Sequence, residues 1–186
     1  MTKIYYTRKK LEIDYNPMNY SKVIIEHVDN KKNVSAKKIS KRTWELFRNI
    51  IKNELMIDIK EANIIFNKNG KPISDKIFFS LSHSNDISVI GVSDYEIAID
   101  VEKIIDNKKV RKLSKKLLKE ENDNIEHFYK LFTSYECKIK YEGSSIGYPK
   151  GSLEEDKKAK SLIINIDDDK YMLSYLSDED VEIIEF

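Results

Sequence analysis

Two groups of neighbouring side chains have residue types that could do polar chemistry. Ser82, His83 and Ser84 form a consecutive triplet, and Asp100 and Glu102 form an acidic pair two residues apart. Alternate residues of a β-strand share a face, so both carboxylates would lie together. Two such acids repel each other unless a cation lies between them. A divalent ion such as Mg2+, which prefers carboxylate oxygens, is one interpretation, and a solvated strand face is the other.

A third group lies further along the chain, where Glu136 and Lys140 are four residues apart. Residues at this spacing share a face of an α-helix. A weak ion pair on the protein surface explains the pattern without further assumptions. In the same way, His83 beside a strand can be a structural residue whose hydrogen bonds are satisfied.

Strands and helices are both needed to position these groups. Apolar residues at helical spacing predict one helix around Trp44, Phe47 and Ile51 and another over residues 125–142, with a basic amphipathic helix over 110–118. Residues 18–28 fit either a helix or a strand. The expected strands cover residues 3–7, 64–66, 77–81, 87–92, 97–102, 161–166, 171–176 and 181–186. Asn69 and Gly70 predict a tight turn. The fold class is therefore α+β.

Composition excludes several classes of function. The chain has 186 residues with 33 basic and 32 acidic side chains, so its charge of +1 predicts neither nucleic acid nor an anionic membrane as partner. No apolar run approaches the roughly 20 residues of a membrane span, and no signal-peptide pattern opens the sequence. The single cysteine, Cys137, excludes an intramolecular disulfide. We expect a cytoplasmic protein.

Four motifs, taken together, resemble the signatures of a known family. They occur in order between about Lys38 and Ile146: Gly70-Lys71-Pro72, then Phe79-Ser-Leu-Ser-His-Ser84, then Ala98-Ile-Asp-Val-Glu102, then Phe132-Thr-Ser-Tyr-Glu-Cys-Lys-Ile-Lys140 with Gly143. In order and spacing this set is similar to the larger, monomeric 4'-phosphopantetheinyl transferases of the surfactin-synthetase-activating type.

The resemblance implies a Mg2+-dependent reaction. Coenzyme A, the co-substrate, would donate its 4'-phosphopantetheine arm to a serine hydroxyl of an apo acyl or peptidyl carrier protein, with release of adenosine 3',5'-bisphosphate. Negative charge grows on the leaving group in such a reaction and must be neutralised. A homologue that binds coenzyme A or a carrier protein without efficient transfer is the alternative. A metal-dependent phosphohydrolase would fit the acids, but it explains neither the Ser-His-Ser triplet nor the Gly-Lys-Pro turn.

The resemblance also implies roles for particular residues. Mg2+ would be held by Asp100, Glu102 and Glu136. Glu136, or a metal-bound water near it, would take the serine proton, and Lys140 would face the pyrophosphate. Contacts with coenzyme A would come from Arg42, Thr43, Gly70, Lys71, Pro72, Ser82 and His83. Arg42 and Thr43 would reach its 3'-phosphate, for which Lys31 and Lys32 are further candidates.

The sequence departs from the family pattern within two motifs. The pattern Trp-x-x-Lys-Glu-Ala is here represented by Phe132, Tyr135, Glu136 and Cys137, so Tyr135 replaces a cation. Ala98 replaces a glycine. The retained acids and Lys140 favour a working transferase over the binding-only homologue.

The family likeness further implies two similar α/β halves related by a pseudo-twofold, with coenzyme A in the seam between them. The expected halves are residues 1–93 and 94–186, and the second would carry the metal site. Carrier recognition would involve the surface around residues 110–118 and the loop after Gly143. One chain would act alone, as a monomer.

Overall fold

A computed structural model of the chain describes residues 1–8, 15–118, 124–144, 149 and 152–186. Helices and strands are mixed along the described chain, which confirms the α+β class. The first sheet has the strand order β4-β5-β1-β9 and the second has β6-β8-β7, while β2 and β3 form a separate hairpin. The strands are β1 (Thr2–Thr7), β2 (Ile65–Phe66), β3 (Pro72–Ile73), β4 (Phe78–Ser84), β5 (Ile87–Ser93), β6 (Ala98–Lys103), β7 (Lys160–Ile166), β8 (Asp169–Leu176) and β9 (Val181–Glu185).

The expected helices are present, with boundaries set by local capping. They are α1 (Lys22–Asp29), α2 (Val34–Leu55), α3 (Lys108–Leu118) and α4 (Ile125–Tyr141), and a short 3-10 turn covers Pro17–Asn19. The ambiguous segment 18–28 is therefore mainly helical. Helix α2 begins earlier than its apolar pattern, because the Asn33 side chain accepts a hydrogen bond from the Ala36 amide at 2.8 Å. After α4, Gly143 has φ +64°, a conformation typical of a helix end.

Two segments of the chain share one topology. We call the segment from β1 to β5 the first unit and the segment from β6 to β8 the second unit. Each contains a strand, a long helix and a final antiparallel pair, and the last strand, β5 or β8, lies in the middle and is antiparallel to both neighbours. The final strand of the chain, β9, returns to the first sheet and pairs parallel with β1. The order of strands is thus repeated in the two units.

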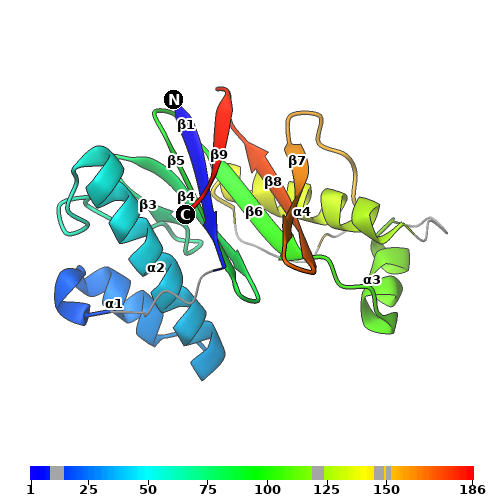
Figure 1. Ribbon diagram of the computed structural model, residues 1–186, viewed down its shortest axis with the longest axis horizontal. Helices are drawn as coiled ribbons and strands as arrows, with labels where there is room; N and C mark the ends of the chain where they lie inside the picture. The colour runs from blue at the N-terminus through cyan, green and yellow to red at the C-terminus, as the bar shows by residue number, and fades with distance from the viewer. Residues whose placement is uncertain (9–14, 119–123, 145–148, 150–151) are drawn as a thin grey trace.

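The layers follow the order helix, sheet, sheet, helix. Helices α1 and α2 lie on one side of the molecule and α3 and α4 on the other, with both sheets between them (Figure 1). Aliphatic residues of both sheets, including Ile4 and Val89 from the first and Ile99 and Leu173 from the second, form one buried cluster. Burial of this cluster stabilises the fold through the hydrophobic effect, and it requires that the two sheets pack against each other.

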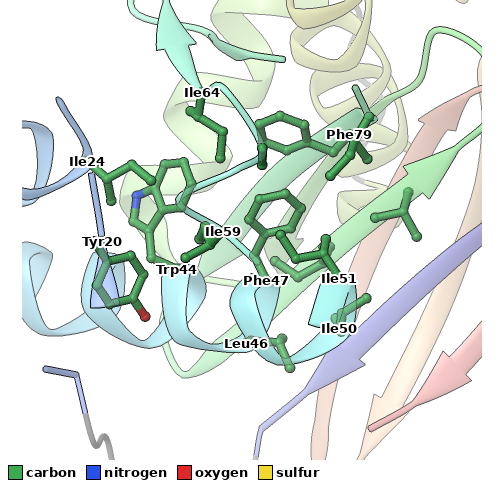
Figure 2. Packing of buried hydrophobic residues seen from close by; sticks show 14 of the residues in the cluster. Tyr20, Ile24, Trp44, Leu46, Phe47, Ile50, Ile51, Ile59, Ile64 and Phe79 are labelled. Carbon is green, nitrogen blue, oxygen red and sulfur yellow. The ribbon is translucent and has the colours of Figure 1, made fainter. Parts of the chain in front are cut away.

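Helix α2 anchors the largest core cluster. Phe47 faces β4 of the first sheet, and the Phe47 and Phe79 rings stack with centroids 4.5 Å apart (Figure 2). The ring of Trp44 lies edge-on to those of Phe47 and Phe66. This packing fixes β4, the strand that carries the Ser-His-Ser triplet.

A glycine allows the two units to approach closely. A Cβ atom on Gly91 of β5 would lie 2.7 Å from Ile97 Cδ1 and 3.3 Å from Ile99 Cγ2. Both atoms belong to side chains, and the nearer one is the flexible end of Ile97, so a larger residue at position 91 would force the Ile97 and Ile99 side chains to move.

Candidate active site

A cavity of about 320 Å³ lies between side chains of both units. The first unit contributes residues of α2, the β2–β3 turn and β4, and the second contributes residues of β6 and α4. Apart from Arg42 and the further candidate Lys32, the site residues expected from the sequence line it: Lys31, Thr43, Gly70, Lys71, Pro72, Ser82, His83, Asp100, Glu102, Glu136 and Lys140. Its size is within the range of small-molecule sites.

The acidic pair of β6 points into this cavity. Its neighbours Ile99 and Val101 belong to the apolar cluster between the sheets, so the alternation expected from the sequence is confirmed. Asp100 is only 3% exposed, which contradicts the interpretation of a solvated strand face. One of its oxygens, Oδ2, is buried and has no hydrogen-bond partner among the described residues. Such an atom is costly unless a ligand satisfies it.

Lys140 pairs with the acidic strand and not with the glutamate one turn before it. Its Nζ donates to Asp100 Oδ1 at 2.6 Å, to the Ile99 carbonyl at 3.1 Å and to Ser82 Oγ at 3.1 Å. The side chains of Lys140 and Asp100 are 15% and 4% exposed. The pair is therefore buried, in contrast to the surface ion pair that its helical spacing alone suggests.

The charges of the site perturb one another. Burial raises the pKa of Glu136, and the nearby Asp100 carboxylate raises it further, although Lys140 opposes this. Burial likewise raises the pKa of Glu102, with Asp100 again adding to the effect. Burial acts to lower the pKa of Lys140, but Asp100 outweighs it and the pKa is raised. Negative charge is therefore concentrated around one buried cation.

The histidines of the cavity lie near cations. His83 is open to the cavity, yet surrounding protein lowers its pKa, as do the charges of Lys140 and Lys31. His27 of α1 also lines the cavity and stacks on Phe66 with ring centroids 4.3 Å apart. Burial lowers the pKa of His27 to about 4. His27 was not among the site residues expected from the sequence, because nothing in its local pattern separates it from a core residue of an amphipathic helix.

The turn between β2 and β3 bridges the two units. Asn67 Oδ1 accepts from the amides of Asn69 and Lys71, which shapes the turn around Gly70 at φ +81°. The side-chain amides of Asn67 and Asn69 donate to the Gly143 carbonyl at 3.2 and 2.7 Å. The turn is thereby tied to the end of α4, a link that its turn signal alone does not reveal.

Two cations of the predicted coenzyme A site have protein partners. Lys71 Nζ lies 2.5 Å from Glu96 Oε1. Arg42 lies outside the cavity lining, buried against β5, where its Nε donates to Ser88 Oγ at 3.1 Å. Its NH2 group has no partner in the part of the chain that the structure describes. Lys31 lines the cavity, whereas Lys32 is not among the described residues that do so.

The departures from the family pattern lie in packed positions. Tyr135 packs against the apolar cluster between α3 and α4, away from the cavity lining. Cys137 and Ala98 belong to one small buried cluster, and the cysteine thiol lies 3.1 Å from the Ala98 carbonyl oxygen. These two departures therefore contact each other where α4 packs on β6.

The donor set suits Mg2+, although the acids are not already gathered around a point. In the described part of the chain, no three His, Cys, Asp or Glu side chains are arranged to hold a metal ion. Mg2+ is commonly bound by one or two carboxylates, with waters and substrate phosphates as its other ligands. The unpartnered Oδ2 of Asp100, in a cavity shared with Glu102 and Glu136, fits this mode.

Comparison with known proteins supports the resemblance. The chain is 32% identical over 120 residues to a 4'-phosphopantetheinyl transferase, gsp, from Aneurinibacillus migulanus. The matched region is 59% of this chain and 51% of that protein, so the chain spans about half the length of this curated relative. No protein-family model matches the chain. The similarity to a 4'-phosphopantetheinyl transferase, predicted from four motifs, is confirmed.

None of the helices that the structure describes is long and apolar enough to cross a bilayer.

Proposed function

We propose that this protein transfers the 4'-phosphopantetheine arm of coenzyme A to a serine hydroxyl of an apo acyl or peptidyl carrier protein and releases adenosine 3',5'-bisphosphate. The observation that carries the proposal is the meeting of residues from all four motifs in one cavity. Asp100, Glu102, Glu136 and Lys140 of the second unit face the Gly70-Lys71-Pro72 turn of the first. Similarity to a named transferase supports the same reaction class.

The reaction needs a base, a cation and a positioned phosphate. The carrier serine oxygen forms a bond to the β-phosphorus of coenzyme A, and the bond from that phosphorus to the bridging oxygen breaks. In our proposal Glu136 accepts the serine proton, since its carboxylate lines the cavity. The leaving adenosine 3',5'-bisphosphate takes the bridging oxygen with its electron pair, and Lys140 stabilises the negative charge that develops there.

Lys140 must exchange partners to act in this way. Its ammonium has three protons, and all three are directed at protein acceptors. Bound at Asp100, Glu102 and Glu136, Mg2+ would neutralise the pyrophosphate charge. Asp100 would then no longer need Lys140 as its counterion, which would let the ammonium turn toward the phosphates.

The remaining cavity residues would bind coenzyme A. Gly70, Lys71 and Pro72 would lie by adenine or ribose, and His83 by the phosphates, next to Ser82, whose hydroxyl donates to Asp100. Thr43 and Lys31 line the cavity and could approach the 3'-phosphate. Arg42 would reach that phosphate only if its unpartnered NH2 group turned from β5 into the cavity.

The architecture and partner also follow from the likeness. The repeated strand order supports two halves related by a pseudo-twofold, divided near residue 93, with β9 returning to the first sheet. Carrier docking on α3 is supported by its exposed lysines, Lys108, Lys109, Lys112, Lys115 and Lys116. The loop after Gly143 includes residues 145–148, which lie outside the described residues. We further propose that the protein acts in the cytoplasm as a monomer.

A mass-shift assay tests the function. Purified protein with Mg2+, coenzyme A and a panel of apo carrier proteins should add the mass of one phosphopantetheine to at least one carrier. Glu136→Gln should slow this transfer about 100-fold or more, because it removes the base. Coenzyme A binding without any mass shift across the panel would contradict transfer and favour the binding-only homologue.

A further inference from the structure

Three serines of β4 join the two units through their side chains. Ser80, Ser82 and Ser84 alternate along the strand, so their hydroxyls share one face. Each hydroxyl accepts a hydrogen bond from a backbone amide of β6: Ile99 to Ser80 at 3.1 Å, Val101 to Ser82 at 3.2 Å and Lys103 to Ser84 at 3.0 Å. The three serines thus satisfy amides at the edge of β6 that pairs with no strand of the described chain.

The partners of the Ser82 hydroxyl determine which of them receives its proton. Its hydroxyl oxygen lies 3.0 Å from Asp100 Oδ1 and also receives the Val101 amide and the Lys140 ammonium. An amide and an ammonium can only donate, so the single hydroxyl proton must be given to Asp100. Ser82 therefore cannot donate to a coenzyme A phosphate while it holds this carboxylate.

Ser84, two residues further along β4, has the same kind of arrangement. It accepts from the Lys103 amide and donates to Glu102 Oε2 at 2.6 Å. Ser82 and Ser84 are only 6% and 7% exposed, so water competes little for these bonds. Both acids of β6 are thus held through one carboxylate oxygen by serines of the other unit, and Asp100 Oδ2 is left without a partner among the residues that the structure describes.

We propose that Ser82 and Ser84 are positioning residues that orient Asp100 and Glu102 toward a divalent cation. This inference rests on the proposed function. It adds that the metal site depends on residues of both units. A hydroxyl that binds one carboxylate oxygen restricts rotation of the side chain and directs the other oxygen into the cavity. Partners of this kind commonly control metal affinity.

Ser80 is a matched control within the same strand. It accepts the Ile99 amide in the same way, but no carboxylate is among the hydrogen-bond partners that the structure gives for its hydroxyl. Ser80→Ala therefore removes an inter-unit hydrogen bond alone, whereas Ser82→Ala and Ser84→Ala also release an acid. A purely structural role would give all three variants the same phenotype.

The experiment measures cation affinity without substrate. Mn2+, which accepts the same oxygen ligands as Mg2+, is titrated into each full-length variant, and the free ion is quantified by electron paramagnetic resonance. Ser82→Ala and Ser84→Ala should each weaken Mn2+ binding about tenfold, and Ser80→Ala less than about twofold. Ser84→Thr, which keeps a hydroxyl, should bind Mn2+ about as tightly as the original protein. Thermal melting of each variant verifies that it is folded.

The outcomes separate this inference from the proposed function. Equal Mn2+ affinities for the three alanine variants, in a protein that transfers phosphopantetheine, would overturn the positioning role and leave the function standing. Loss of affinity in Ser84→Thr equal to that in Ser84→Ala would overturn it as well. If an alanine variant does not fold, Ser82→Thr and Ser84→Thr are compared with Ser80→Thr, and weaker Mn2+ binding by either of the first two would contradict the proposal. A protein that neither binds Mn2+ nor modifies any carrier would overturn both.

Discussion

The first and second units arrange their strands in the same order, but they bring different side chains to the shared cavity. The first unit contributes hydroxyls, imidazoles, aromatic rings, lysines and a tight turn, whereas the second contributes all the carboxylates and Lys140. In each unit the long helix packs on its own sheet. Helix α2 uses that contact mainly for aromatic core packing, while α4 carries Glu136 and Lys140 into the cavity.

The difference shows how one topology can serve two purposes. The second unit concentrates charges that repel each other and are costly to bury. The first unit supplies neutral donors, such as the hydroxyls of Ser82 and Ser84, that hold those charges in place. Neither unit contains the candidate site by itself, so variants on each side should fail in different ways.

The largest effect is expected from Asp100 of the second unit. Asp100→Ala leaves Lys140 buried without its counterion, which should lower the free energy of unfolding by about 3 kcal/mol in urea titrations. Phosphopantetheine transfer should fall about 10³-fold, because a principal acidic group of the proposed metal site is lost.

The double variant Asp100→Ala with Lys140→Met separates these two effects. Replacing both charges by apolar groups should restore most of the lost stability, while transfer stays absent. Full transfer activity in Asp100→Ala would contradict the metal assignment.

The hydrogen bonds from Asn67 and Asn69 to the Gly143 carbonyl, which we call the Asn67 clamp, should affect substrate binding more than the chemical step. Asn67→Ala removes the bonds that shape the Gly70-Lys71-Pro72 turn and one link to Gly143. We expect KM for coenzyme A to rise about 5- to 10-fold with kcat nearly unchanged, because a looser turn lowers uniform binding. Asn69→Ala, which keeps the turn bonds of Asn67 Oδ1 to Lys71, should give a smaller rise. An equal loss of kcat and kcat/KM would show that the clamp acts on the reacting groups instead.

His27 should make the first unit sensitive to acid. Its pKa is about 4 in the folded protein, against an ordinary value of 6.5, so the unfolded state takes up the proton first. This contribution to stability is complete above pH 6.5 and is lost as the pH falls toward 4. His27→Phe, which can keep the stacking on Phe66, should reduce the loss of stability over that range by about 1–2 kcal/mol. Unfolding titrations at several pH values measure the difference, and parallel curves for both proteins would contradict it.

Tyr135 should have the smallest effect on the site. Tyr135→Lys replaces a partly buried phenol that packs against the apolar cluster to which α3 and α4 contribute, so we expect about 1 kcal/mol lower stability. KM for coenzyme A should change by less than about twofold, because Tyr135 does not line the cavity. A clear gain in turnover or coenzyme A affinity would show instead that the absence of the motif lysine from the second unit limits catalysis or coenzyme A binding.

The sequence predicted the local elements well where periodicity was strong. The apolar stripe of α4 and the alternation of apolar and acidic residues in β6 are both visible in the order of neighbouring residues. Segment 18–28 was ambiguous because Val23, Ile24 and Ile25 suit either a helix or a strand, and packing of Ile24 and Val28 on α2 decided for a helix.

The candidate site was only partly predictable. Order and spacing of motifs selected the residues that line the cavity, but local spacing suggested a surface pair of Glu136 with Lys140. The fold instead brings Lys140 to Asp100, forty residues away along the chain. Arg42 was assigned from its place in the sequence, yet its helix turns it toward Ser88. His27 and the Asn67 clamp join the site through contacts that no short motif encodes.

The sequence by itself determined which residues alternate, which share a helix face and which motifs resemble those of a transferase, because these properties depend on near neighbours in the chain. Only the tertiary structure decided which oxygen of each acid is held and which cation balances it. Those choices depend on β4 and β6 lying side by side, and their serine hydroxyls and backbone amides meet only after both sheets have packed.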